Sequence, residues 1–188
     1  MRYAEDHKAK TRQRIIEEAA RLFRQDGVGA TGLQPLMKAL GLTHGGFYAH
    51  FKSKDELVEI ALQHATEQLK GSAEESLSSA TPVATFISRY LSPAHRANPG
   101  AGCPLTTMCA ELGQRGQPSE LTDQVIRERL SMLESHLPGD TAAEQSVLVL
   151  SAMVGALLLS RSVKDPELAD RLLQGTRHLL IEQTKAAQ

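Results

Sequence analysis

The sequence predicts an all-α protein. In every long segment the apolar residues recur three and four positions apart, which is the spacing of one face of a helix, and no segment alternates as a strand does. Proline and glycine separate the segments, as at Pro82, Pro93 and Pro138-Gly139. With 188 residues, 41% of them hydrophobic, the chain can form a small N-terminal domain over residues 1–54 and a larger helical domain over residues 55–188.

The N-terminal domain is predicted to begin with an amphipathic helix over about residues 9–25, which ends at Gly27. A second helix of about two turns should follow, with apolar positions Leu33, Leu36, Met37 and Leu40. Pro35 fits only the first turn of that helix, because proline has no backbone N–H to donate. We therefore expect its cap at Gly32 rather than at Thr31.

The stretch over residues 41–54 predicts a turn and a short, outward-facing helix. Gly41 can adopt the left-handed conformation that ends one helix, and Thr43 is a good N-cap for the next. Phe47 and Phe51 lie one helical repeat apart, so they should anchor this helix in the core. The other faces of the helix are left exposed.

The larger domain is predicted to consist mainly of longer helices. Ser53 with Glu56 three residues later is a capping box at the start of the first one. Further helices should begin at Pro82 and next to Cys103. Three more are expected over about residues 118–137, 141–163 and 165–184.

Charge is distributed unevenly along the chain. Residues 1–54 carry ten Lys and Arg against five Asp and Glu, a balance of +5, while the whole chain has a net charge of −1, so the remainder carries −6. A basic head on an acidic body suggests that the head alone binds a polyanion. The alternative is an ordinary solvated helix surface.

The predicted elements form a helix-turn-helix arrangement: a short helix, a glycine turn and a second helix with exposed polar residues. In this arrangement the second helix enters the major groove of DNA. The motif residues are Leu33, Leu36, Ala39-Leu40-Gly41, Thr43, Gly45, Phe47-Tyr48, Phe51 and Ser53-Lys54. With this pattern the segment from Thr31 to Lys54 resembles the DNA-binding domain of the TetR/AcrR family of bacterial regulators, over about residues 8–60 in all. Pro35 and Ala49 depart from common members, which weakens any forecast of the operator sequence but not of DNA binding.

The resemblance implies a set of DNA contacts. Tyr48 and Lys54 fall where family members contact phosphates, and Gln34, His44, Gly45 and Gly46 fall where bases or the adjoining backbone are often read. Thr43 offers a hydroxyl and free N–H groups at a helix start, which suits a phosphate. The expected set is Thr31, Gln34, Thr43, His44, Gly45, Gly46, Tyr48, His50 and Lys54.

Several of these positions have a second interpretation. Gly45 and Gly46 should each weaken a helix by up to about 1 kcal/mol, so either DNA approaches their backbone or the helix packs tightly on Leu36 or Leu40. His50 can contact DNA or pack beside its phenylalanine neighbour. The basic residues His7, Lys8, Lys10 and Arg12 could reach phosphates as a flexible arm or remain simply solvated.

The resemblance also implies a homodimer, built by the last two helices as a four-helix bundle, that binds near-palindromic operator DNA. A wide apolar arc suits this: Val147, Leu150, Val154, Leu157 and Leu158. The bundle would hold the two reading helices about 34 Å apart, to match successive major grooves.

A pocket for an unknown small-molecule effector is implied inside the larger domain. The candidate lining residues, each of which could instead be plain core, are Phe86, Tyr90, Cys103, Leu105, Met108, Cys109 and Leu112, together with Leu62 and Met132. Cys103 follows a Pro/Gly loop and is expected at or next to a helix N-terminus, where a thiol becomes more reactive. It is either a reactive switch, as in family members that electrophiles or oxidants inactivate at such a cysteine, or a small packing residue.

The sequence is compatible with three functions. The first is a repressor released from its operator by a small molecule, the second is an electrophile- or redox-sensing repressor switched at Cys103, and the third is a helical adaptor without DNA binding. An enzyme, a cofactor and a metal site are not expected, because the histidines are scattered and no Cys/His spacing suits zinc.

We expect a soluble, cytoplasmic protein without membrane contact. The first 14 residues are polar and basic, unlike a signal peptide. The longest apolar segment, residues 147–159, is interrupted by Ser151 and Gly155 and is shorter than the roughly 20 residues of a membrane span. The two cysteines do not suggest a disulfide framework.

Overall fold

The structure is a computed structural model that describes residues 2–186, with side chains described from residue 6 to residue 185. Within this range every regular element is helical and none is a strand, so the predicted fold class is confirmed. The elements are α1 (Arg2–Gln25), α2 (Leu33–Ala39), η1 (His44–Ala49), α3 (Lys54–Leu77), α4 (Pro82–Tyr90), α5 (Pro93–Ala97), η2 (Pro99–Ala101), η3 (Pro104–Thr106), α6 (Met108–Gln114), α7 (Glu120–Glu134), α8 (Ala142–Ser162) and α9 (Pro166–Ala186), where η marks a 3-10 helix.

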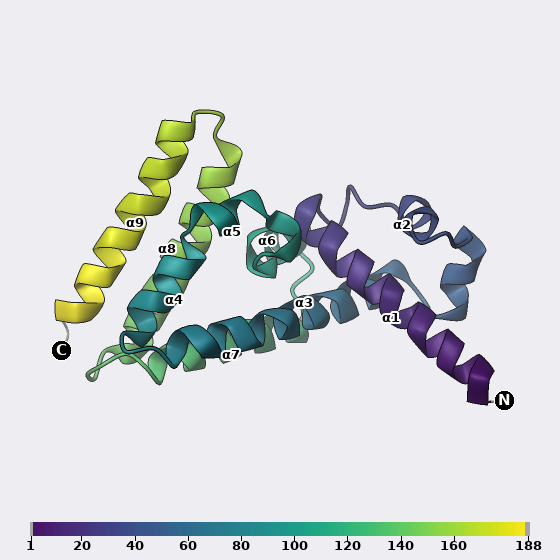
Figure 1. The fold of residues 1–188 in the computed structure, drawn as a ribbon, viewed down its shortest axis with the longest axis horizontal. Coiled ribbons are helices and arrows are strands. Elements are labelled where there is room, and N and C mark those ends of the chain that lie inside the picture. The colour runs from purple at the N-terminus through teal and green to yellow at the C-terminus, as the bar shows by residue number, and fades with distance from the viewer. Residues whose placement is uncertain (1, 187–188) are drawn as a thin grey trace.

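The molecule is elongated, with a head at one end and a body at the other (Figure 1). The head at one end contains α1, α2 and η1, and the body at the other end contains α4, α7, α8 and α9. Helix α3 starts in the head and runs into the body, where it packs on α4 and α7. Helix α6 and the short turns before it lie between α1 and α8. A change in the body can therefore reach the head through α3 and through the segments around α6.

The turn between α2 and η1 has the geometry that its glycine predicted. Gly41 has a φ of +73°, and its N–H donates to the carbonyl of Lys38 at 3.0 Å. The N–H of Leu42 donates to the carbonyl of Met37 at 2.8 Å. Together these two bonds form a Schellman motif, which satisfies carbonyls at the end of the helix. Gly32 caps the start of α2, as expected.

The reading helix is shorter and tighter than predicted. A helix over residues 43–51 was expected, and the structure has a six-residue 3-10 helix, η1, instead. Two consecutive glycines weaken helix propagation, while the Thr43 hydroxyl accepts the N–H of Gly46 at 3.2 Å and fixes the first turn. Phe47 and Phe51 are buried and stack with their ring centroids 5.4 Å apart, so their anchoring role is confirmed.

The capping box at the start of α3 is present in a shifted form. The Ser53 hydroxyl accepts the N–H of Glu56 at 3.1 Å, as predicted. The Glu56 carboxylate, however, accepts the N–H of Lys52 at 2.6 Å rather than that of Ser53. Both bonds connect the residues that follow η1 to the first turn of α3.

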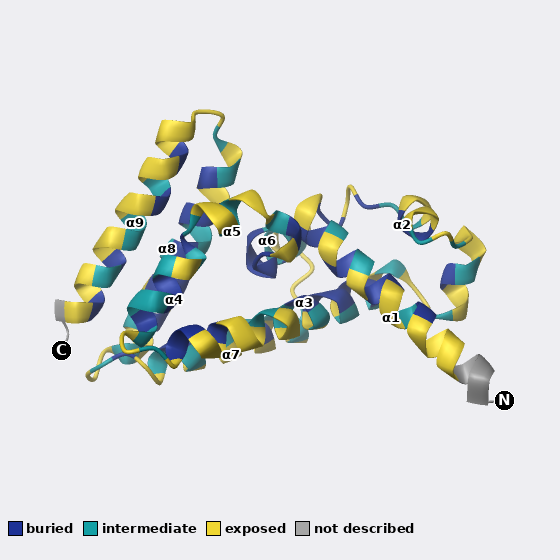
Figure 2. Ribbon diagram, viewed as in Figure 1, coloured by how far each residue is buried: buried dark blue, intermediate teal, exposed yellow. Residues whose placement is uncertain are grey.

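Two separate hydrophobic cores stabilise the fold, and buried positions follow one face of each helix (Figure 2). The head core takes α3 residues as far as Ala65 and also Met108 from α6, so α3 belongs to both halves. The body core is built by α4, α7, α8 and α9. The domain boundary at residue 54 stays a prediction, since one helix continues across it.

Helix α8 is apolar on all sides, and the predicted arc mixed two of its faces. Leu150 and Leu157 are buried in the chain's own core, whereas Val147 and Leu158 are exposed. Helical spacing identifies neighbours on one face, but it cannot show which face of an all-apolar helix packs inward. The exposed large apolar residues of α8 and α9 are Val147, Leu148, Leu158, Leu159, Leu168 and Leu179.

The apolar segment over residues 147–159 lies inside a longer helix, α8. The helix has 21 residues and a mean hydropathy of 1.8 over its best window, so by length and composition it could cross a bilayer. Its packing indicates a core helix instead, because Val149, Met153 and Leu157 are part of the body core and α8 packs extensively against α7 and α9.

Candidate DNA-binding surface and ligand cavity

The outer surface of the head is formed by η1 and the start of α2. Gln34, Thr43, His44 and Gly45 are exposed, and the side chain of Tyr48 is 60% exposed although it is aromatic. The Tyr48 ring meets the edge of the buried Phe47 ring at 5.2 Å between centroids, which fixes its direction. This surface can present a phenol, a hydroxyl, an imidazole and an amide to one partner.

The glycines of η1 are not required by packing inside the protein. A methyl group added at Gly45 would meet no atom within 4 Å, and one added at Gly46 would make only ordinary contacts with Thr43 and Met37. The alternative explanation, tight packing on Leu36 or Leu40, therefore has no support in the structure. The close approach of DNA to the backbone at Gly45 stays a prediction.

Three expected contacts lie deeper than the others. The Thr31 hydroxyl is buried and donates to the carbonyl of Gly27 at 2.8 Å. The Lys54 ammonium donates to the carbonyl of Val28 at 2.5 Å, and burial lowers its pKa. His50 is half-buried, and its Nδ1 is buried without a partner among the described residues. Thr31 and Lys54 thus support the loop before α2, and their roles as DNA contacts stay predictions.

The basic N-terminal segment is helical rather than a flexible arm. His7, Lys8 and Lys10 are exposed on α1, which continues without a break from Arg2 to Gln25. The Arg12 guanidinium lies 4.9 Å from the centroid of the Phe51 ring. Burial lowers the pKa of His50, and the nearby charges of Lys8 and Arg12 add to this. The cations are therefore held next to the reading segment in a fixed geometry.

A cavity of about 640 Å³ opens in the body between α3, α4 and α7. Four predicted effector contacts line it: Phe86, Tyr90, Cys103 and Leu105. The prediction missed the polar and charged residues of the wall: Ser72, Ser76, Thr81, Thr85, Ser88, Arg89, Ser92, His95 and Arg129. A signal for Arg129 was available, because it lies four residues after Val125 and three after Ile126, on the apolar face of α7.

The remaining predicted effector contacts lie elsewhere, which corrects the sequence analysis. Met108 and Leu62 are part of the head core, and Leu112 packs against that core. Cys109 packs between the two cores, and Met132 lines a separate shallow depression. The chain turns after η3, so α6 faces the head instead of the cavity.

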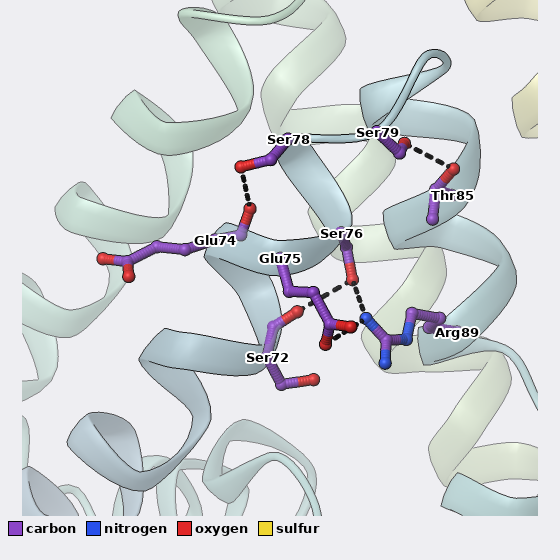
Figure 3. A network of polar contacts seen from close by, with 8 residues as sticks. All are labelled: Ser72, Glu74, Glu75, Ser76, Ser78, Ser79, Thr85 and Arg89. Carbon is purple, nitrogen blue, oxygen red and sulfur yellow. Dashed lines mark hydrogen bonds and ion pairs between the residues drawn. The ribbon is translucent and has the colours of Figure 1, made fainter.

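Ser72, Ser76 and Arg89 form a polar network between α3 and α4 at the cavity wall (Figure 3). The Ser76 hydroxyl donates to the carbonyl of Ser72 at 2.8 Å and accepts from Arg89 at 3.1 Å. Arg89 also pairs with Glu75 at 2.9 Å. These bonds fix one side of the cavity by linking two helices.

Comparison with known proteins identifies the head. Residues 15–61 match the family model described as bacterial regulatory proteins, tetR family. The head belongs to the TetR family. An HTH-type transcriptional regulator of Mycobacterium tuberculosis is 26% identical over 182 residues, which covers 90% of this chain and 94% of the relative. The regulator LmrA of Bacillus subtilis is 26% identical over 166 residues, covering 82% and 88% of the two chains.

The fold of the whole chain is also found in solved structures. A TetR transcriptional regulator from Chloroflexus aurantiacus superposes with a TM-score of 0.80 at 23% identity, covering 96% of each chain. This TetR protein is a DNA-binding transcriptional regulator with a helix-turn-helix head. TetR-family proteins are regulators rather than enzymes, and they are soluble cytoplasmic proteins that bind operator DNA as dimers and respond to small molecules.

In this TetR protein two arginines, a buried one on α1 and a half-buried one on α8, hold the connection between α4 and α6, residues 91–107, against both ends of the molecule. Arg24 of α1 donates to the carbonyl of Gly102 at 3.3 Å and to Gln68 of α3 at 2.8 Å. Arg161 of α8 donates to the carbonyl of His95 at 2.6 Å and to Thr106 at 3.1 Å. Burial lowers the pKa of both guanidiniums, which still remain charged at neutral pH.

A second link joins α6 to the head. The Glu111 carboxylate accepts the N–H groups of Val28 at 2.5 Å and of Gly29 at 2.7 Å, in the loop before α2. Arg115 pairs with the same carboxylate. Sequence reasoning missed Glu111, because an acidic residue in the first turn of a helix ordinarily stabilises that helix alone. Any movement of α6 is thereby transmitted to the backbone that positions α2 and η1.

Cys103 caps η3, a turn of only three residues, so the expected long helix with its dipole does not start there. The cysteine is buried and lines the cavity. Burial raises the pKa of its neighbour Cys109 to about 11, with a smaller contribution from Cys103, so the Cys109 thiol is protonated at neutral pH. Both cysteines are free thiols.

His95 connects the cavity wall to the segment that Arg24 and Arg161 hold. Its Nδ1 lies 2.8 Å from the carbonyl of Tyr90, and its Nε2 accepts the N–H of Cys103 at 3.0 Å. These partners require a proton on Nδ1 and a lone pair on Nε2, so the imidazole is neutral. Burial lowers its pKa below 6.5, the bond to Tyr90 opposes the shift, and the charge of Arg161 adds to it.

Replacing His95 should therefore change how stability depends on pH. Because the folded-state pKa is depressed, the unfolded chain takes up this proton first as the pH falls, and the stabilisation from His95 is lost below about pH 6.5. The free energy of unfolding of the wild type should exceed that of His95→Gln at about pH 7.5, and the difference should shrink towards about pH 5.5. Urea unfolding at these pH values measures it, and a difference that is constant or grows on acidification contradicts the assignment.

The Gly45→Ala variant should lose operator affinity without losing stability. The added methyl meets no protein atom, and alanine is the better helix former by up to about 1 kcal/mol, so the unfolding free energy should be equal or higher. If DNA approaches this backbone, affinity should fall about tenfold, the cost of one disturbed contact. Fluorescence anisotropy with a labelled operator measures this.

Gly71→Ala is the matched control for that experiment. Gly71 lies on α3 away from η1, and a methyl added there also meets no atom within 4 Å. This variant should keep full operator affinity. Equal affinities for both variants and the wild type would remove Gly45 from the DNA surface.

Proposed function

We propose that this TetR regulator is a homodimeric repressor that binds a near-palindromic operator and releases it when a small molecule occupies the body cavity. The observation that carries the proposal is the position of His95 and Cys103. Both line the cavity, and both lie in the connection over residues 91–107 that Arg24 ties to the head. A ligand that displaces either residue would move the contacts that set the position of the head.

The exposed leucines of α8 and α9 support the dimer. Leu148 and Leu159 lie on α8, and Leu168 and Leu179 lie on α9, all exposed to solvent in a single chain. The two helices pack against each other, and an apolar surface of this kind is typical of an interface. Its partner is a second copy of the same surface, because isologous contacts close a two-fold dimer.

The DNA-binding role assigns the head surface to the major groove. Gln34 and His44 would read base edges, while Thr43 and Tyr48 would contact phosphates, and Gly45 would let the backbone approach the DNA. Few side chains of η1 reach outward, so DNA shape would contribute to selectivity. The basic residues of α1 would add affinity that does not depend on sequence.

Electrophile sensing at Cys103 is the second candidate function, supported by the position of this thiol in the cavity wall. A small electrophile would have to enter the cavity to reach it, because the residue is 5% exposed. Operator release by oxidants or quinones that is lost in Cys103→Ser would favour this candidate. Release that persists in Cys103→Ser would favour a reversible ligand.

Sedimentation and operator binding together test the proposal. The purified protein should sediment as a dimer and bind DNA from upstream of its own gene, with affinity that falls steeply as the salt concentration rises. Dimer formation should depend on Leu159 and Leu179. A dimer without salt-dependent DNA binding would favour the adaptor, and a monomer that binds single half-sites would refute the dimeric arrangement.

Replacing Glu111 tests whether α6 positions the head. Glu111→Ala removes the acceptor of the Val28 and Gly29 N–H groups, so the loop before α2 is held less firmly. We expect operator affinity to fall about threefold to tenfold, the cost of a typical hydrogen bond or two. Because α6 faces the head core rather than the reading surface, the dependence of affinity on salt should stay unchanged.

Glu128→Ala is the control for the change in net charge. Glu128 is an exposed carboxylate on α7 that accepts a bond from Gln124 and none from the head. This variant should bind the operator as the wild type does. If both variants bind more tightly, charge alone explains the effect, and the positioning role of Glu111 is refuted.

A further inference from the structure

The described residues that line the cavity include two arginines and no carboxylate. Arg89 of α4 and Arg129 of α7 both line the cavity, and among the described lining residues there is no aspartate or glutamate. His95 also lines the cavity, but its imidazole is neutral. Its Nδ1 bonds to the carbonyl of Tyr90, and its Nε2 accepts the N–H of Cys103. The cavity is therefore an environment that favours an anion.

The two arginines differ in how much of their hydrogen-bonding capacity is used. Arg89 is already held by Glu75 and Ser76 (Figure 3). Arg129 makes no ion pair within residues 6–185, and its only hydrogen bond in that range is a weak one to the Met132 sulfur at 3.8 Å. A guanidinium can donate two parallel bonds to one carboxylate, so Arg129 is available for such a partner.

A second group in the wall also lacks a partner. The hydroxyl of Tyr90 is buried and has no oxygen or nitrogen partner within the described part of the chain, and the neighbouring Cys103 thiol is only a weak hydrogen-bonding group. Burial raises the pKa of Tyr90 well above its ordinary value, the neighbouring Cys103 adds to this, and the charges of Arg161 and Arg129 oppose it. Tyr90 is thus protonated at neutral pH and can donate a bond to a ligand. A buried hydroxyl without a partner is costly, and a bound acceptor would remove that cost.

Apolar side chains form the next part of the wall, beside the serines and threonines of α3 and α4. Leu69, Phe86, Leu105 and Leu150 come from four different elements and face one space of about 640 Å³. Such a cavity has the size of a typical small-molecule site, with an apolar lining and a few polar groups. The cationic and hydroxyl groups would orient a ligand, and the apolar residues would supply most of its buried area.

We propose that the cavity binds an amphiphilic organic acid, whose carboxylate pairs with Arg129 within reach of the Tyr90 hydroxyl while its apolar body lies against Phe86 and Leu150. This assignment rests on the proposed function, because it names the chemical class of the effector. The acid would occupy the space next to His95 and Cys103. Binding of the acid would therefore act directly on the connection over residues 91–107 that Arg24 and Arg161 hold.

Matched acids and amides test the assignment. The probes are 1-naphthaleneacetate and decanoate, each compared with its neutral amide, titrated calorimetrically into the full-length protein. At least one acid should bind about tenfold to hundredfold more tightly than its amide, the contribution of a charge-assisted hydrogen bond. Arg129→Gln should abolish this preference, Arg129→Lys should retain part of it, and Tyr90→Phe should weaken acid binding severalfold.

Arg127→Gln is the matched control. Arg127 lies two residues earlier on α7, pairs with Asp123 at the surface and does not line the cavity, so its loss removes the same charge elsewhere. This variant should keep the preference for acids. Amides that bind as tightly as acids, acid binding that survives Arg129→Gln, or no binding of either acid at millimolar concentration would each overturn the assignment.

Operator binding is measured separately, so that the two proposals can fail independently. Anisotropy without any probe tests whether the protein binds its operator, and the same titration with each probe tests release. Operator release by the amides as readily as by the acids would keep the proposed function and overturn the acid assignment. Acid-selective binding in calorimetry without any operator binding would keep the acid site and overturn the repressor.

Discussion

Two arginine side chains, the buried Arg24 and the half-buried Arg161, hold the middle of this TetR regulator together. Arg24 comes from the head and Arg161 from the body helix α8, and both donate to backbone carbonyls of the connection over residues 91–107. Neither is paired with a carboxylate among the described residues. Neutral carbonyls satisfy the donors in a fixed direction, so the fork geometry of arginine, which lysine lacks, sets the distance between head and body.

This arrangement explains how a cavity in the body can control a surface in the head. The cavity wall includes His95 and Cys103, which are joined by a hydrogen bond, and Arg161 donates to the carbonyl of His95. From there the chain continues into α6, where Glu111 holds the loop before α2. Cavity, connection, α6 and reading segment are thus joined by hydrogen bonds to backbone, which transmit a displacement because their lengths and directions are restricted.

The sequence predicted the helix-turn-helix well because each of its features is local. Gly41 takes the positive φ that its turn requires, Thr43 and Ser53 cap the elements that follow them, and Phe47 and Phe51 enter the core. Most of the cavity wall escaped prediction. Met108 and Leu112 were expected in its wall and belong to the head core instead, because a turn after η3 reverses the direction in which α6 faces.

By itself, the sequence determined the fold class, the capped turns, the aromatic anchors and the family, since these depend on residues within about one helical repeat of each other. Only the tertiary structure decided which face of the all-apolar helix α8 is exposed, and that Arg129 and Tyr90 meet in one cavity. It also decided that Glu111 reaches Val28 and Gly29 across more than eighty residues. Contacts between segments so distant in sequence leave no local periodicity, because they are set by how helices pack.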